Sequence, residues 1–190
     1  MTLWLRRYPA LIAALLAPLL AWGLLVGPAK AQSASTPELD TLFAQLRVAP
    51  DAASAKAIDR QIWMEWLSPD DPELMGRMQL ALVKLSTDPT GALADFAAIT
   101  ADYPNYAEGW NQLATLHFTL GDYENSLAEI DKVLQLEPRH FGALAGRALI
   151  YHSQGKRALA VKAITAALAL HPFLSERALF PELLDDVTRI

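Results

Sequence analysis

Apolar residues recur at helical spacing along most of the chain beyond residue 36. One stripe, within residues 107–120, is made of Trp110, Leu113, His117 and Leu120. The next, within residues 123–136, is made of Leu127, Ile130, either Val133 or Leu134, and Leu136. Steps of three and four residues place side chains on one face of an α-helix. We therefore predict two amphipathic helices, joined at Gly121 because glycine can take the positive φ that ends a helix.

This pattern recurs at a fixed interval along the chain. The equivalent positions are Pro104, Pro138 and Pro172; Gly121 and Gly155; Phe96, Ile130 and Ile164; and Ile99, Val133 and Ala167. Each proline of the first set closes a helix pair, because proline disfavours helical geometry in the residue before it. A fixed period of about 34 residues is typical of repeat architectures. The sequence predicts an all-α solenoid of stacked antiparallel helix pairs.

The same signals divide the chain into segments. We expect helix pairs at residues 72–106, 107–140 and 141–172, preceded by a degenerate first pair at about 37–70. The turn near Asp88–Gly91 is expected to hold an extra residue or two. Residues 173–190 are predicted to cap the last pair, which would otherwise expose an apolar face. Pro181 starts or kinks the helix of this cap.

Residues 1–31 have the features of an export signal. Arg6 and Arg7 precede an apolar stretch from about residue 8 to residue 26, and Ala29-Lys30-Ala31 follows it. A basic start, an apolar centre and an Ala-x-Ala end are typical of a segment that signal peptidase removes. We predict cleavage after Ala31, a linker at residues 32–36 and a periplasmic protein without membrane attachment. A retained anchor is the alternative, since about 19 apolar residues can just span a bilayer.

Residues 103–146 resemble the tetratricopeptide repeat family. The resemblance rests on the run WNQLA from Trp110 to Ala114, on Gly121-Asp122-Tyr123 and on Glu137-Pro138. The resemblance to the family covers about residues 39–172, and residues 103–146 in particular resemble exported tetratricopeptide proteins of alphaproteobacteria. The family implies a right-handed α-solenoid with a C-terminal capping helix and a concave groove that binds peptides. We call the equivalent positions of successive repeats a column. The residues of this sequence that stand in the family's groove columns are Arg77, Ala81 and Lys84; Asn111, Thr115, Phe118 and Thr119; and Ala145, Leu149, His152 and Ser153.

The sequence does not support the subtype of the family that clamps a C-terminal carboxylate. Ala81 and Gln112 stand where that subtype has asparagines. Gly142 and Gly146 stand where its third helix needs basic residues.

Composition and charge exclude several function classes. Cysteine is absent, so disulfides, thiol catalysis and thiolate metal sites are excluded. Without Arg6, Arg7 and Lys30, 13 of the 16 Lys and Arg residues remain against 21 Asp and Glu. Nucleic-acid binding needs clustered basic residues, so this balance argues against it.

The histidines and acids form no pattern that predicts an enzyme, a metal site or a cofactor site. His117 and His152 lie almost one period apart and could meet across adjacent repeats, but packing or surface positions are the simpler interpretation. Trp110 matches a packing column and is expected in the core. Trp63 and Trp66 fit either the core or an interaction patch.

These observations predict a non-catalytic periplasmic adaptor or scaffold that binds a protein or peptide segment on the concave face of the solenoid. The alternative is a structural role, in which the chain forms a homo-oligomer through its repeat ends or through Trp63 and Trp66. Assistance in assembling an envelope enzyme complex is a further alternative.

Overall fold

The computed structural model describes residues 36–183, which contain helices and no strands. The helices are α1 (Pro37–Arg47), α2 (Ala52–Leu67), α3 (Pro72–Lys84), α4 (Pro89–Asp102), α5 (Ala107–Thr119), α6 (Tyr123–Leu136), α7 (Phe141–Ser153), α8 (Arg157–Leu170), and the 3₁₀ segments η1 (Ser175–Leu179) and η2 (Pro181–Leu183). Among these helices, none is both long and apolar enough to cross a membrane. The predicted signal segment, most of the linker and the last part of the cap, at residues 184–190, lie outside the described residues.

Aspartate side chains begin four of these helices. In each case the carboxylate accepts a hydrogen bond from a backbone N–H of the first turn, which has no partner within the helix. The four residues are Asp51, Asp71, Asp88 and Asp122. Gly121 and Gly155 have φ values of 77° and 69°. The predicted glycine turns are therefore confirmed.

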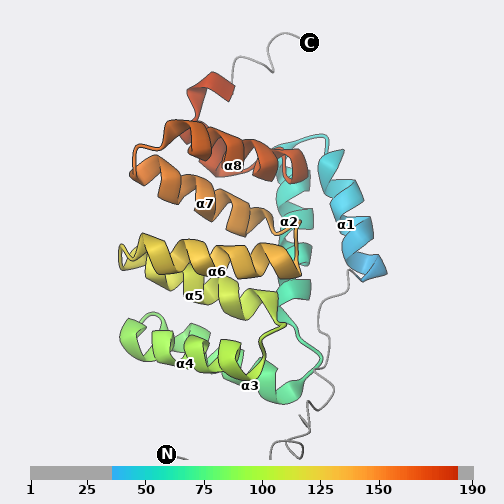
Figure 1. The fold of residues 1–190 in the computed structure, drawn as a ribbon. Helices are drawn as coiled ribbons and strands as arrows, with labels where there is room; N and C mark the ends of the chain where they lie inside the picture. The colour runs from blue at the N-terminus through green and yellow to red at the C-terminus, as the bar shows by residue number, and fades with distance from the viewer. Residues whose placement is uncertain (1–35, 184–190) are drawn as a thin grey trace, which may run out of the picture. The chain divides into compact units, whose positions relative to one another are not determined.

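Helices α3 to α8 form three antiparallel pairs, which stack side by side (Figure 1). The columns of the repeat period form the core of the stack, since Phe96, Ile130, Ile164, Ile99, Val133 and Ala167 are all buried. The buried Ser126 replaces the alanine usual at its column, and its hydroxyl donates to the Ala114 carbonyl at 2.8 Å. The predicted all-α solenoid is confirmed.

The first pair departs from the period by one position. Helices α3 and α5 start at Pro72 and Ala107, and helices α4 and α6 start at Pro89 and Tyr123. The distance along the sequence from α3 to α5 is therefore one residue longer than the distance from α4 to α6. The difference lies in the turn, which covers Leu85–Asp88 after α3 but only Leu120–Asp122 after α5. The extra residue predicted for this turn is confirmed.

Helices α1 and α2 form a hairpin that is not the first member of the stack. This N-terminal hairpin (residues 37–67) lies across the ends of the repeat helices, with α1 against α8 and α2 against α5 (Figure 1). Its apolar core contains Trp66 and takes in Phe141 of α7, with Leu170 and Leu174 packed against it. The expectation of a degenerate first repeat at residues 37–70 is therefore corrected. The physical reason is that the hairpin buries its aromatic residues against the far end of the stack.

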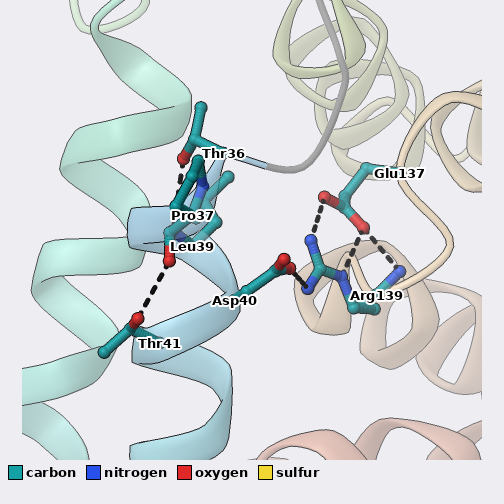
Figure 2. Close-up of polar contacts among 7 residues, drawn as sticks. All are labelled: Thr36, Pro37, Leu39, Asp40, Thr41, Glu137 and Arg139. Atoms are coloured by element: carbon teal, nitrogen blue, oxygen red, sulfur yellow. Dashed lines mark hydrogen bonds and ion pairs between the residues drawn. The ribbon is translucent and has the colours of Figure 1, made fainter.

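Arg139 connects α1 to the junction between α6 and α7. Its guanidinium donates to Asp40 at 2.7 Å and to Glu137 at 3.1 and 3.2 Å (Figure 2). It also lies over the Phe43 ring, 4.5 Å from the centroid. Exposed ion pairs contribute at most about 1 kcal/mol each. Apolar burial therefore contributes more than these charges to holding the hairpin in place.

Two of the five tryptophans lie in the hairpin. Trp66 is buried and Trp63 is half-buried, with their ring centroids 5.2 Å apart. Both rings pack against Phe141. The core interpretation is confirmed for Trp66, whereas Trp63 packs on this core and keeps exposed surface.

Trp110 packs against the apolar clusters on both sides of α5 but remains half-buried. Its Nε1 donates to the Pro104 carbonyl at 2.9 Å. The largest side chains among the fully buried residues are phenylalanines, at positions 96, 141 and 180. The predicted packing column for Trp110 is right, but the indole keeps an exposed edge.

The described part of the cap consists of η1 and η2 rather than an α-helix. Phe180 is fully buried against α7 and α8, next to Leu174 and Leu183. Pro181 starts η2, as the sequence predicts. Between Pro172 and Pro181 the chain forms the short 3₁₀ segment η1, and the buried ring of Phe180 follows it.

Candidate peptide-binding groove

A groove of about 580 Å³ is bordered by α2, α5, α7 and the cap. Small residues line it on α5 and α7: Ala114, Gly142, Ala145 and Gly146. Larger apolar side chains are Trp63, Phe118, Leu149 and Phe173. A Cβ atom added at Gly146 would meet only Ile130, at 3.7 Å, so the groove is open beside this residue.

Five of the residues predicted for the groove line it: Asn111, Thr115, Phe118, Ala145 and Leu149. Thr119, His152 and Ser153 are not among its lining residues. The His152 ring instead contacts Phe180 of the cap and shares a hydrogen bond with Arg157. The sequence could not place the cap and so could not show that it takes up His152.

Arg77 and Lys84 are not part of this groove, and their assignment is corrected. They line a separate depression between α3 and α4. Arg77 donates to Asp102 at 2.8 Å, and Lys84 pairs with Asp95 at 2.5 Å.

The physical reason is that the groove is bordered by α2, α5 and α7, and no residue of α3 lines it. The extra residue in the turn after α3 also shifts the equivalent positions on this helix by one. Once that residue is counted, Leu80 and Val83 become the equivalents of Thr115 and Phe118. Leu80 and Val83 are 71% and 73% exposed, whereas Ala81 is fully buried. The predicted groove positions on α3 are therefore wrong by one residue.

A buried polar network lies next to the groove. The Glu108 carboxylate accepts hydrogen bonds from Asn111 at 3.2 Å, Gln112 at 2.6 Å and His140 Nε2 at 3.0 Å. His140 Nδ1 in turn accepts the N–H of Ala143, which lies in the first turn of α7. Buried polar groups are costly unless they are paired, and Glu108 supplies these partners. Because the amide nitrogen of Asn111 is engaged here, its carbonyl oxygen is the group that can face a ligand.

Charged side chains gather at the end of the groove near the cap. Lys56 and Asp59 come from α2, and His171 and Glu176 come from the last junction and η1. Burial lowers the pKa of His171 below its ordinary value near 6.5, although Asp59 lies 3.7 Å from Nε2. Burial also raises the pKa of Asp59, against the opposing effect of His171. This end of the groove carries both signs of charge.

Gly142 explains why one of the two basic residues of a carboxylate clamp, the one at its own position, has no place on α7. A Cβ atom at Gly142 would lie 2.8 Å from the Trp63 ring. Helix α2 therefore occupies the space that a longer side chain at this position would need.

Sequence reasoning missed the groove residues of α2 and the cap. Lys56, Asp59 and Trp63 belong to the hairpin, and Phe173 and Glu176 belong to the cap. These residues lie outside the columns of the repeat period, so the period carried no information about them. The Trp63/Trp66 spacing was the one signal that singled out α2.

The comparison with known sequences decides the family. Residues 86–136 and 111–175 match the tetratricopeptide repeat family. A TPR repeat-containing protein of Rhizobium etli is 38% identical over 143 residues, which cover 75% of this chain and 70% of the relative. The chain belongs to the tetratricopeptide repeat family.

Solved structures similar to this tetratricopeptide protein include two of MamA. The crystal structure of MamA has a TM-score of 0.48 and 17% identity, over 69% of this chain and 74% of MamA. A point mutant of MamA has a TM-score of 0.48 and 14% identity, over 70% of this chain and 94% of the mutant.

Proposed function

We propose that this tetratricopeptide protein is a non-catalytic adaptor, which binds a peptide segment of a partner protein in the groove between α2, α5 and α7. The fold is that of a protein-interaction scaffold. The observation that carries the proposal is the open groove of about 580 Å³, with small residues on the repeat helices and aromatic rings beside them. Ligand sites in proteins commonly measure about 300–1,000 Å³.

Apolar contact supplies most of the binding energy in this proposal. Phe118 and Leu149 are half-buried, and Phe173 is 40% exposed, so each keeps surface that a ligand can cover. Covering such surface contributes about 25 cal/mol per Å². The exposed Thr115 and Ser175 line the same groove, and their hydroxyl oxygens can accept hydrogen bonds while donating to the main-chain carbonyl of Asn111 and the Glu176 carboxylate.

The polar residues of the described chain support a binding role rather than a catalytic one. The His140–Glu108 pair is fully buried, and the His117–Glu129 pair joins α5 to α6. The Ser126 hydroxyl donates to a backbone carbonyl. In residues 36–183, no group of three or more His, Asp or Glu side chains is placed to hold a metal ion.

The proposed place of action is the periplasm, after removal of residues 1–31. The support is the sequence alone: Arg6 and Arg7, the apolar stretch behind them, and Ala29-Lys30-Ala31.

A bulky side chain in the groove tests the binding proposal. Peptides are selected on the purified chain from a random phage-displayed library, and their affinities are measured by fluorescence anisotropy. Thr115→Trp is expected to weaken the selected peptides at least about tenfold, because Thr115 is exposed and lines the groove. Thr119→Trp is the matched control, since Thr119 is exposed one turn further along α5, outside the groove lining. Equal affinities for both variants and the wild type would contradict groove binding.

Self-association through a repeat end is the second candidate function. Leu80 and Val83 are exposed in the depression between α3 and α4, and no described helix covers them. Terminal repeats usually carry a polar outer face, because an apolar one promotes association. The charges beside these residues are paired as Arg77–Asp102 and Lys84–Asp95, so a second copy meets little net charge there.

Light scattering separates the two candidates. If the α3–α4 face joins two copies, Leu80→Glu converts a dimer into a monomer. Leu120→Glu, at a 59% exposed residue in another turn, leaves the dimer intact. A monomeric wild-type protein at concentrations of about 100 μM would exclude a stable dimer.

A further inference from the structure

The Asn111 side chain offers its carbonyl oxygen to the groove. Its Nδ2 lies 3.2 and 3.3 Å from the two carboxylate oxygens of Glu108, which also accept from Gln112 and His140. Because this carboxylate acts as an acceptor, the amide nitrogen of Asn111 and not its oxygen must face it. Asn111 is 7% exposed, and no donor within residues 36–183 bonds to its Oδ1. A buried acceptor without a donor is unfavourable, so this oxygen points to a donor on a ligand.

The hydroxyl groups of Thr115 and Ser175 have the same polarity toward a ligand. The Thr115 hydroxyl donates to the main-chain carbonyl of Asn111 at 2.9 Å, and the Ser175 hydroxyl donates to the Glu176 carboxylate at 3.2 Å. Each hydroxyl has a single proton, so only its lone pairs remain for a ligand. Together with the Asn111 oxygen, these groups favour a ligand that brings N–H donors.

Two carboxylates at the cap end of the groove lack a basic partner. Asp59 and Glu176 line this end, and neither forms an ion pair with a lysine or arginine of residues 36–183. Burial and the charge of Glu176 raise the pKa of Asp59, against the opposing effects of His171, Trp63 and Arg60. A cation that contacts both carboxylates would relieve their mutual repulsion.

The basic residues on the same helix as Asp59 leave this place open. Lys56 lines the groove but is exposed, and a lysine side chain is flexible and strongly hydrated, so it can turn toward solvent. Arg60 is exposed and lies outside the groove lining. Beyond residue 31 the chain has 13 Lys and Arg residues against 21 Asp and Glu, so its overall field also attracts a cationic ligand.

We propose that the groove selects a partner segment with a lysine or arginine side chain, whose cationic group pairs with Asp59 and Glu176 while a backbone N–H of the segment donates to Asn111 Oδ1. This inference rests on the proposed function, because it concerns the same groove. Apolar side chains of the segment cover Phe118 and Phe173. A free C-terminal carboxylate does not suit this arrangement, since it brings a negative charge and only acceptors.

Blocked peptides measure the preference for a cation. Peptides selected from the phage-displayed library are synthesised with acetylated N-termini and amidated C-termini, and their affinities are measured by fluorescence anisotropy at low ionic strength. We expect the selected peptides to share a lysine or arginine. Replacing it by the neutral analogue, norleucine for lysine or citrulline for arginine, is expected to weaken binding about tenfold or more. Glutamate at this position is expected to weaken binding further.

Variants of the protein locate the cation. Asp59→Asn combined with Glu176→Gln is expected to lower the affinity for the basic peptide to that of its neutral analogue, and to leave the affinity for the analogue unchanged. Glu65→Gln is the matched control, because it removes a carboxylate from an exposed position of α2 outside the groove lining. If the double variant does not fold, Glu176→Gln alone decides, since Glu176 lies in η1 of the cap. It is then expected to reduce the preference in part.

Ester bonds in the peptide backbone test the role of Asn111. An ester in place of one amide removes a single N–H donor and keeps every side chain. At one position the ester is expected to weaken binding about fivefold in the wild type and to have no effect in Asn111→Leu. Thermal melts check that this variant is folded. Equal losses in both proteins at every position would contradict the contact with Asn111.

Failure of this inference can be distinguished from failure of groove binding. If Thr115→Trp weakens the selected peptides while their basic and neutral forms bind equally, the groove binds peptides without the proposed preference. An unchanged preference in the double variant would place the cation elsewhere. A gain in affinity when the C-terminal carboxylate is left free would reverse the polarity assigned to the groove. If the library yields no binding peptide, both proposals are wrong.

Discussion

At the scale of single residues, packing and binding share the same side chains. Phe118 lines the groove, yet its ring also packs against Tyr123 with a centroid distance of 5.8 Å. Asn111 lines the groove and is 7% exposed, with its amide nitrogen bonded to Glu108. Replacing either residue by alanine therefore changes stability as well as affinity. Thr115, which is exposed, is the cleaner probe of the groove.

Trp110 and Phe96 test how the burial of a side chain determines the loss in the free energy of unfolding when it is replaced by alanine. Phe96 is fully buried, so Phe96→Ala is expected to cost about 3–5 kcal/mol in the free energy of unfolding. Trp110→Ala is expected to cost less, about 2–3 kcal/mol, because the indole is half-buried and loses one exposed hydrogen bond. Urea melts of both variants provide the comparison. A larger loss for Trp110→Ala would place that ring at the centre of the core.

At the scale of elements, the position of α2 depends on the absence of a side chain at Gly142 of α7. Gly142 leaves room for the Trp63 ring, whereas a Cβ atom at Gly146 would make only an ordinary van der Waals contact, with Ile130 at 3.7 Å. Gly146 lies inside α7, where glycine is less favourable than alanine by about 1 kcal/mol, and Gly142 lies in the first turn of this helix. The two positions differ in their contact with the hairpin.

Two alanine substitutions measure that difference. Gly146→Ala is expected to stabilise the protein by up to about 1 kcal/mol, through helix propensity alone. Gly142→Ala is expected to lose this gain or to destabilise, because its Cβ would lie 2.8 Å from Trp63. Thermal melts give both values under one set of conditions. An equal gain at both positions would mean that α2 does not press against α7 there.

At the scale of the whole molecule, the sequence revealed the periodic contacts and the extra residue in the turn after α3, but it did not reveal the contacts that lie outside the period. The columns of Phe96 and Ile99 were predictable because each repeat contacts its neighbours in the same way. The one-residue shift at Leu80 and Val83 follows from a turn whose length the period does not constrain. The hairpin position depends on contacts such as Trp66 with His140, which lie far apart in the sequence, and helical spacing carries no information on such pairs.

Export of the whole molecule is predicted to remove residues 1–31. Protein isolated from its native host is expected to begin at Gln32, because Ala29 and Ala31 have the small side chains that signal peptidase requires. N-terminal sequencing measures this directly. Recovery of a membrane-bound chain that starts at Met1 would contradict the proposed periplasmic location.

The most direct test of groove binding is site-specific photo-crosslinking in cells of the native host. A photoreactive amino acid at Thr115 reports on the groove, and one at Glu124, which is exposed on α6, reports on a surface outside it. The proposal predicts that Thr115 forms a crosslink to a partner protein, that Glu124 does not, and that Gly146→Leu removes the product by filling the groove. A partner captured from Glu124 and never from Thr115 would contradict it.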